Sequence, residues 1–129
     1  MRPAIALVAL AWLAAPACAQ PQANDAASRG AAIVASRSTG LCVLCHAVPG
    51  VDAVHAGTLG PSLAGVGTRL GPEELRLRLV APRRFNPETI MPSYGPTEGL
   101  ERVAAARRGQ PILDARQIDD VVAYLATLR

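Results

Sequence analysis

The sequence contains no lysine: its thirteen basic side chains are all arginines, set against ten acidic ones, for a formal net charge of +3. We expect no nucleic-acid partner for a chain so weakly charged. Aromatic residues are also scarce, at 3% of 129 residues, although half of the chain is apolar. This composition suits one compact domain, and it excludes both a multidomain enzyme and a disordered acidic protein. Because aromatic side chains supply much of the burial in ordinary domains, we expect something else to fill part of this core.

A short apolar run at the amino terminus predicts export. Arg2 is followed by twelve consecutive apolar residues at 4–15, and the small residues of Ala17-Cys18-Ala19 are typical of a cleavage site. At 1.5 Å per residue, the run cannot cross the roughly 30 Å of a bilayer core. We therefore predict a secretory signal peptide over residues 1–19 and a periplasmic domain over residues 20–129, with no membrane span.

Two other interpretations of this terminus stay open. A buried helix is disfavoured by Pro3 and Pro16, and lipidation of Cys18 is disfavoured by the residues before it. Cleavage after Ala19 leaves 110 residues with a net charge of +2. The remaining thiols are then Cys42 and Cys45, and the remaining aromatic residues are Phe85, Tyr94 and Tyr124.

Two helices are expected to frame the domain. The first spans about 26–37, with Asn24 or Asp25 as its cap. The last opens at Asp114, with Gln117 placed three residues on as in a capping box. The last helix is predicted to be apolar at Ile118, Val121, Val122, Leu125 and Leu128 and to turn Asp119 and Asp120 toward solvent.

The segments between these two helices are predicted as short helices and loops. Residues 72–80 alternate with a period of two, as a strand would, but a leading proline, two following glutamates and the lack of a partner strand favour a short helix. Residues 51–68 and 83–96 are rich in glycine or proline and are expected to be loops, and 100–108 a short helix or turn. The predicted fold class is all-α, with several helices around one core.

The chemistry is carried by the run Cys42-Val43-Leu44-Cys45-His46. Cys-x-x-Cys-His is the attachment signature of a c-type haem, whose vinyl groups take up the two thiols while the adjacent imidazole ligates the iron. A thioredoxin-like motif would need a βαβ unit, a disulfide here would close almost no loop, and zinc would need Cys42, Cys45, His46 and His55 together. We predict one covalently attached haem c, which also supplies the large apolar body that the scarce aromatics do not.

A second axial ligand can come from Met91 or from His55. Met91 is followed by proline in the loop 86–92, where a core-filling methionine is not needed, so it is predicted as the ligand in preference to His55. The carbonyl of Pro61 is predicted to accept a hydrogen bond from the free ring nitrogen of His46; the less favoured alternative is that Gly60-Pro61 only forms a turn.

Two further features concern packing and charge. Gly30 is predicted to let the first helix approach the last one near Tyr124; alternatively it only weakens its helix. A local excess of positive charge is predicted either to dock an acidic patch on a partner or to be a solvated face. It comprises Arg69, Arg76, Arg78, Arg83 and Arg84.

The chain resembles the SoxX family, the small monohaem c-type subunits of the SoxAX cytochrome of sulfur oxidation. The resemblance covers about residues 27–129, and its most specific stretches are 40–47, 55–67, 83–94, 109–113 and 120–125. It implies a class I cytochrome c fold in which Cys42 and Cys45 hold the haem and His46 and Met91 ligate its iron.

The same resemblance implies a set of partners. SoxA would form a heterodimer with this chain, and its own haem site would join thiosulfate to a cysteine of the SoxYZ carrier (L-cysteine S-thiosulfotransferase activity). This subunit would contain no catalytic residue, and would pass the released electrons to a small soluble cytochrome c. The alternatives are a free-standing class I cytochrome c shuttle in another respiratory chain and a haem-free thiol-disulfide enzyme.

Overall fold

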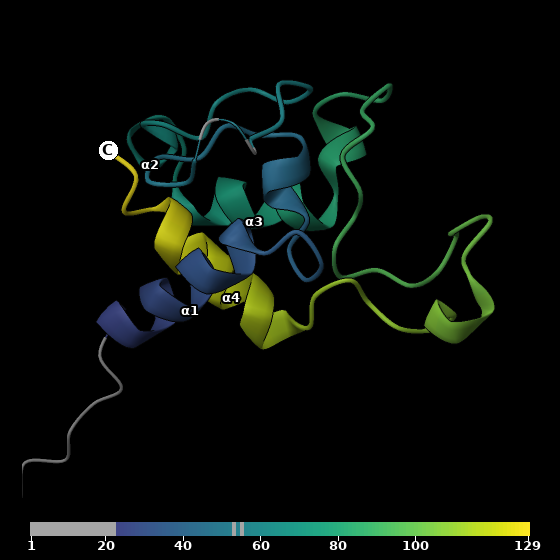
Figure 1. Ribbon diagram of the computed structural model, residues 1–129. Coiled ribbons are helices and arrows are strands. Elements are labelled where there is room, and N and C mark those ends of the chain that lie inside the picture. The colour runs from purple at the N-terminus through teal and green to yellow at the C-terminus, as the bar shows by residue number, and fades with distance from the viewer. Residues whose placement is uncertain (1–22, 53, 55) are drawn as a thin grey trace, which may run out of the picture.

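The computed structural model describes residues 23–129 except 53 and 55 (Figure 1). The predicted signal peptide, Cys18 and His55 lie outside the described residues. Within this part of the chain the structure contains four α-helices and no strand, so the predicted all-α class is confirmed. The helices are α1 (Ala23–Ala35), α2 (Val66–Arg69), α3 (Pro72–Val80) and α4 (Ala115–Leu125), and single 3₁₀ turns are formed by η1 (Cys42–Leu44), η3 (Pro82–Arg84) and η4 (Ala105–Arg107).

The packing of α1 against α4 organises the domain (Figure 1). A Cβ atom at Gly30 would overlap the backbone oxygen of Asp120 and lie 2.8 Å from Cβ of Tyr124, so the two backbones approach closely at this point. The predicted role of Gly30 in this crossing is therefore confirmed. Glycine is required there because any other side chain would push the helices apart.

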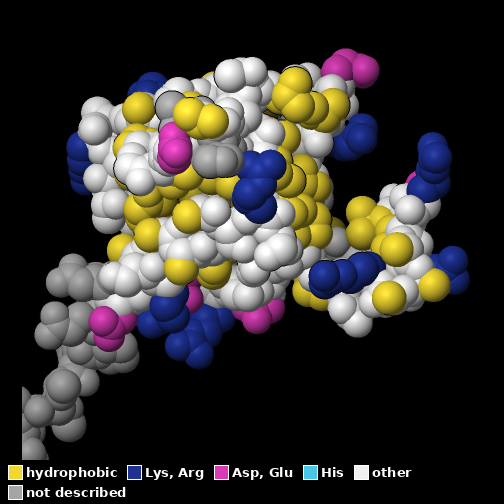
Figure 2. Space-filling view, in the orientation of Figure 1, with side chains coloured by type: hydrophobic (Ala, Val, Ile, Leu, Met, Phe, Trp, Pro, Cys, Tyr) yellow, Lys and Arg dark blue, Asp and Glu magenta, His cyan; other side chains and the backbone are white. Residues whose placement is uncertain are grey.

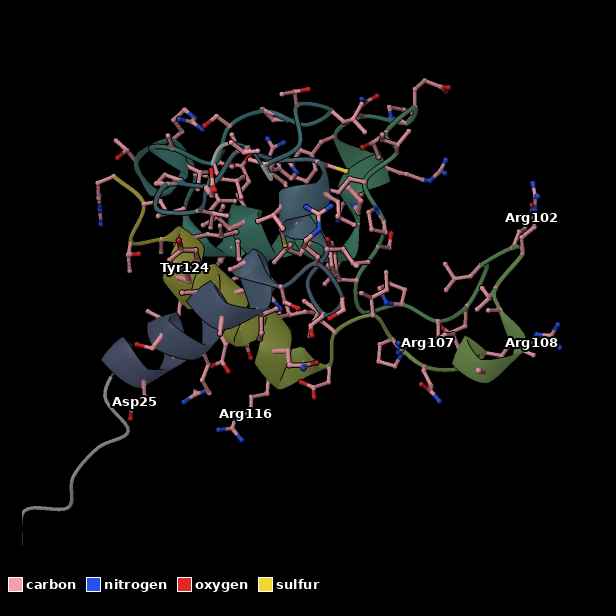
Figure 3. The ribbon with its side chains drawn as sticks, in the orientation of Figure 1. Asp25, Arg102, Arg107, Arg108, Arg116 and Tyr124 are labelled. Carbon is pink, nitrogen blue, oxygen red and sulfur yellow. The ribbon has the colours of Figure 1, made fainter. Side chains whose placement is uncertain are left out.

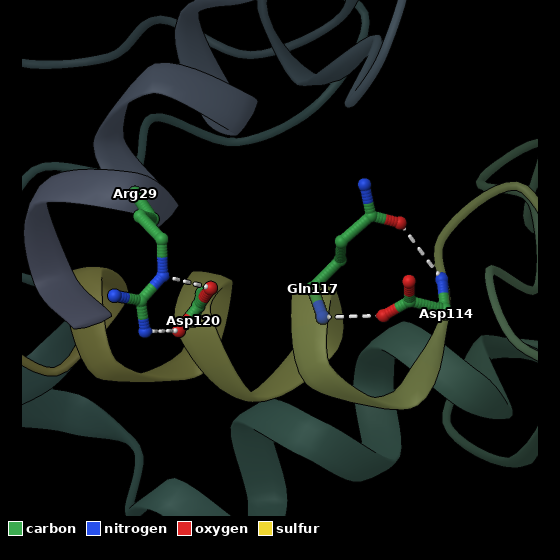
Figure 4. A network of polar contacts seen from close by, with 4 residues as sticks. All are labelled: Arg29, Asp114, Gln117 and Asp120. Atoms are coloured by element: carbon green, nitrogen blue, oxygen red, sulfur yellow. Dashed lines mark hydrogen bonds and ion pairs between the residues drawn. The ribbon is translucent and has the colours of Figure 1, made fainter.

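The amino-terminal cap of α4 is the predicted capping box. The Asp114 carboxylate accepts from the backbone nitrogen of Gln117 at 2.8 Å, and the Gln117 side chain accepts from the backbone nitrogen of Asp114 at 2.9 Å (Figure 4). These two bonds satisfy backbone donors that the first turn of a helix leaves without partners. Pro72–Val80 is helical as predicted, and its Leu75 and Leu79 are buried.

Two predictions about the framing helices are wrong. Helix α1 begins at Ala23, so Asn24 and Asp25 lie inside its first turn instead of capping it. Asp120 does not face solvent: it is only 5% exposed, because its position on α4 turns it toward α1. There it accepts two hydrogen bonds from the Arg29 guanidinium, both at 2.7 Å (Figure 4).

The core lies between α1, α3, α4 and the segment that follows α1. Its buried residues include Val34, Val43, Val48, Val66, Leu113, Ile118, Val121, Val122 and Leu125. Tyr94 is the one aromatic side chain among the buried residues of the described chain. No helix in the described ranges has the length and apolar character needed to cross a membrane.

Candidate haem site

The Cys-x-x-Cys-His motif forms one tight turn directly after α1. Leu41 adopts a left-handed conformation (φ 61°), which redirects the chain into η1. The backbone nitrogens of Cys45 and His46 then both donate to the carbonyl of Cys42, at 3.1 and 2.9 Å. Both cysteines are free thiols. The turn therefore presents two thiols and an imidazole within five consecutive residues.

The imidazole of His46 is oriented from outside its own segment. Its Nδ1 lies 2.6 Å from the carbonyl oxygen of Pro61. Because a carbonyl oxygen only accepts, we assign the ring proton to Nδ1, which leaves the lone pair of Nε2 free to ligate a metal. A Cβ atom at Gly60 would lie 2.7 Å from Nδ1, so the ring rests directly on the Gly60 backbone. The predicted hydrogen bond between His46 and Pro61 is thus present.

Three backbone hydrogen bonds attach the loop over residues 57–63 to the segment that contains the motif. Gly57 donates to Val43 at 2.8 Å, Gly60 donates to Cys45 at 2.7 Å, and Leu63 donates to Ala47 at 2.9 Å. The two segments run side by side through these bonds, so the loop that carries the Pro61 carbonyl is held in register with the ring that it orients. This is why a segment rich in glycine and proline is nevertheless fixed beside the motif.

Met91 lies half-buried in a loop that local hydrogen bonds hold in shape. Its backbone nitrogen donates to Oγ1 of Thr89 at 3.1 Å, and its side chain packs against the core. Upstream, the Asn86 side chain accepts from the backbone nitrogen of Glu88 at 3.0 Å. Three residues beyond Met91, Tyr94 ties the loop to the rest of the domain.

Tyr94 is the residue of this site that the sequence analysis did not single out. Its hydroxyl donates to the carbonyl of Gly40 at 2.8 Å, and Sγ of Cys42 donates to the same oxygen at 3.3 Å. Burial raises the pKa of the Tyr94 hydroxyl and that of the Cys42 thiol, so both groups stay protonated donors in the absence of a ligand. The end of the Met91 loop is thereby joined to the start of the motif. The feature of the sequence that could have indicated this role of Tyr94 is a tyrosine close after Met91 in a chain with few aromatic residues.

Several large apolar side chains in the segments that form this site are exposed. Among the described residues, most exposed large hydrophobic side chains lie in the segments next to the motif, the Pro61 loop and Met91. They are Leu44, Val54, Leu59, Phe85 and Ile90, and Ile90 is 75% exposed. Two free thiols, an imidazole nitrogen with a free lone pair, a thioether and an apolar surround are the donor set and setting of a covalently bound haem. The residues present therefore fit that group.

The comparisons with known proteins agree with this chemistry. The family model described as cytochrome c matches residues 27–129. The chain belongs to the cytochrome c family. Membership implies a covalently bound haem c. No curated protein matches the sequence at a significant level.

One solved structure narrows the assignment within the family. The crystal structure of SoxXA from P. pantotrophus is similar with 33% sequence identity and a TM-score of 0.69, over 78% of this chain and 80% of that chain. The predicted class I cytochrome c fold and the resemblance to SoxX are confirmed, and the chain is a SoxX-type electron-transfer cytochrome.

Proposed function

We propose that this chain is the electron-transfer subunit of a periplasmic SoxAX complex and carries one haem c. Cys42 and Cys45 would hold the haem through thioether links, and His46 and Met91 would ligate its iron. The observation that carries the proposal is the likeness to SoxXA, at 33% identity over most of both chains. The free thiols and the orientation of the His46 ring support the assignment of the ligands.

When bound, the haem supplies a site that takes up and releases one electron at a time. The chain's own residues set the conditions for that site. The Pro61 carbonyl holds the proton of His46 on Nδ1 and makes the opposite nitrogen a stronger donor. Ligation by methionine and histidine raises the reduction potential relative to two histidines, which suits a subunit that accepts electrons. With His46 and Met91 both ligating the iron, no position would be left open for a small substrate.

The proposed reaction takes place on the partner. Joining a carrier-protein thiol to thiosulfate forms a new S–S bond, and it releases two electrons and the thiol proton. The carbon–sulfur and sulfur–oxygen bonds stay intact. The SoxA partner performs this coupling on the SoxYZ carrier, and this chain passes the electrons one at a time to a small soluble cytochrome c. The chain itself contributes no catalytic residue.

A reconstitution tests the function. The purified holo-chain is mixed with thiosulfate, the carrier and, in one arm only, the SoxA-type subunit of the same organism, and reduction of the haem is followed by its absorbance. We expect reduction only when SoxA is present. Equal reduction without SoxA contradicts the assignment as a subunit, and no reduction in the complete mixture favours a free-standing shuttle of another respiratory chain.

A mass spectrum of the protein recovered from the periplasm tests the site and the location together. The expected mass is that of residues 20–129 plus one haem. A bare polypeptide contradicts covalent attachment and would favour a thiol-disulfide enzyme. A lipid-modified form beginning at Cys18 contradicts cleavage after Ala19.

A further inference from the structure

The segment of residues 97–110, which we call the arm, stands away from the compact body (Figure 1). The segments that flank the arm meet, because Leu113 donates its backbone N–H to the carbonyl of Tyr94 at 3.1 Å. Only Thr97 and Val103 of the arm are half-buried, and its other residues are exposed. The arm therefore adds almost nothing to the core of this chain.

The arm has a defined shape in spite of its exposure. Its 3₁₀ turn η4 is followed by a hydrogen bond from Gln110 to the carbonyl of Arg107 at 3.2 Å. Gly99, Gly109 and also Arg102 adopt left-handed conformations, with φ of 69°, 71° and 58°. A left-handed conformation is uncommon for an arginine.

The charges on the arm have no partners within the described chain. Arg102, Arg107 and Arg108 form no ion pair or side-chain hydrogen bond with another described residue. Figure 3 shows Arg102 and Arg108 at the outer end of the arm, pointing away from the body. Some arginines of the body are paired, as Arg29 is with Asp120 and Arg78 with Glu74.

The same outer end is hollowed, and apolar and arginine side chains share the surface of the arm (Figure 2). A hollow of about 250 Å³ is lined by Leu100, Val103, Arg102 and Arg108, together with Thr97 and Gly109. Leu100 is 47% exposed, so a large apolar side chain is left uncovered there. Guanidinium groups beside apolar side chains are the combination that binds a carboxylate whose neighbours are apolar, as at protein interfaces.

We propose that the arm is a docking surface for an acidic patch on the partner subunit, with Arg102 and Arg108 pairing with its carboxylates and Leu100 packing against an apolar neighbour. The inference rests on the proposed function, since it places a contact of that complex. A second copy of this chain is a poor occupant, because a symmetric contact would bring together two arms that each carry three arginines against two glutamates. The two glutamates of the arm, Glu98 and Glu101, oppose binding to an anionic lipid surface.

The test compares two charge reversals of equal size. The variant Arg102→Glu/Arg108→Glu changes the arm, and the control Arg116→Glu/Arg129→Glu changes two exposed arginines on α4 and at the carboxyl end. Binding of each holo-protein to the SoxA-type subunit is measured by calorimetry at several salt concentrations. We expect the arm variant to weaken binding by about tenfold or more and to flatten the salt dependence, while the control changes it by less than about threefold.

The outcomes separate the two proposals. If the wild-type chain binds and the arm variant binds equally well, the arm is not the docking surface, and the proposed function stands. If the wild-type chain does not bind the SoxA-type subunit, both proposals fail. If ultracentrifugation shows that the chain alone forms a dimer that the arm variant loses, the occupant is a second copy and the proposal is overturned. Leu100→Ala, which leaves the charge unchanged, is expected to weaken binding equally at all salt concentrations.

Discussion

A single carbonyl oxygen orients the imidazole ring of the motif. The Pro61 carbonyl lies 2.6 Å from Nδ1 of His46, and the Gly60 backbone fills the space beneath the ring. The motif alone brings a histidine next to two thiols, but it does not set which ring nitrogen carries the proton. That choice comes from a loop fifteen residues further along the chain.

The ligand assignment of Met91 has a direct spectroscopic test. Met91→Ala is expected to remove the weak long-wavelength absorption band of iron bound to a thioether and to lower the reduction potential, because a methionine ligand favours the reduced iron. Visible absorption of the oxidised protein and redox titration are the measurements. Persistence of the band would show that another sulfur atom is bound. Thr89→Ala, which removes only the hydrogen bond to the Met91 backbone, is the control that should keep the band.

Tyr94→Phe tests the tie between the Met91 loop and the motif. Removing the hydroxyl leaves the buried Gly40 carbonyl without its 2.8 Å partner, so we expect the free energy of unfolding to fall by about 1–3 kcal/mol. Denaturant unfolding of the holo-protein measures this. Tyr124→Phe is the matched control, because the Tyr124 hydroxyl makes no hydrogen bond to another described residue, and its effect should stay within about 0.5 kcal/mol. Equal losses in the two variants would contradict the role of Tyr94.

At the scale of elements, the approach of α1 to α4 depends on the absence of a side chain at Gly30. Replacing a glycine inside a helix by an alanine normally stabilises the helix by about 1 kcal/mol. Here Gly30→Ala is expected to destabilise the protein by about 1–3 kcal/mol, because the added methyl group overlaps the α4 backbone. Thermal unfolding measures the change, and Gly71→Ala, where a Cβ meets open space, is the control. A stabilised Gly30→Ala would show that the helices can move apart freely.

The ion pair across the same crossing makes stability depend on pH. The hydrogen bonds from Arg29 lower the pKa of the Asp120 carboxyl below its ordinary value. The pair therefore contributes its full stability above the unfolded pKa of about 3.9, and this contribution is lost as the pH falls through the folded pKa. We expect Asp120→Asn to be less stable than wild type near neutral pH and to show a smaller loss of stability on acidification.

The neighbouring exposed pair is the control for this variant. Asp119 accepts from Arg76 at the surface, where screening by water keeps an ion pair weak. Asp119→Asn is therefore expected to leave the acid dependence of stability nearly unchanged. Urea unfolding at a series of pH values compares the two variants. If the two variants lose stability equally on acidification, the burial of the Asp120 carboxylate does not strengthen its ion pair.

At the scale of the whole molecule, the buried core is small and nearly free of aromatic side chains. Tyr94 is its one aromatic residue in the described chain, while Phe85 and four large aliphatic side chains next to the motif and Met91 are uncovered. A haem bound there would cover apolar surface that the protein alone leaves in water. We therefore expect the folded protein to be stable only when the haem is attached.

This coupling predicts the behaviour of a haem-free chain. Cys42→Ala/Cys45→Ala is expected to lack fixed tertiary packing, with weak near-ultraviolet circular dichroism, binding of a hydrophobic dye and no cooperative thermal transition. Cys45→Ala alone keeps one thiol for attachment and should retain part of the structure. A haem-free double variant that unfolds cooperatively, as the holo-protein does, would show that the polypeptide core is sufficient.

Local patterns were enough to predict several elements. Each of three features depends on residues only a few positions apart, so it can be recognised from a short stretch of sequence. They are the capping box at Asp114 and Gln117, the helix over 72–80 and the Cys-x-x-Cys-His motif. The start of α1 was predicted three residues late, because Asn24 and Asp25 are good caps and equally good first-turn residues. Whether such a residue caps the helix or lies in its first turn depends on where the chain enters the helix.

By itself, the sequence determined the motif of two thiols and an imidazole, since the spacing of these groups is set within one turn of backbone. Only the tertiary structure decided that Asp120 is buried against Arg29, that Tyr94 joins the Met91 loop to Gly40, and that the arm stands free with unpaired arginines. Each of these depends on which group lies opposite a side chain. Residues 91 or 54 positions apart meet only when the helices have packed, and no local period encodes that meeting.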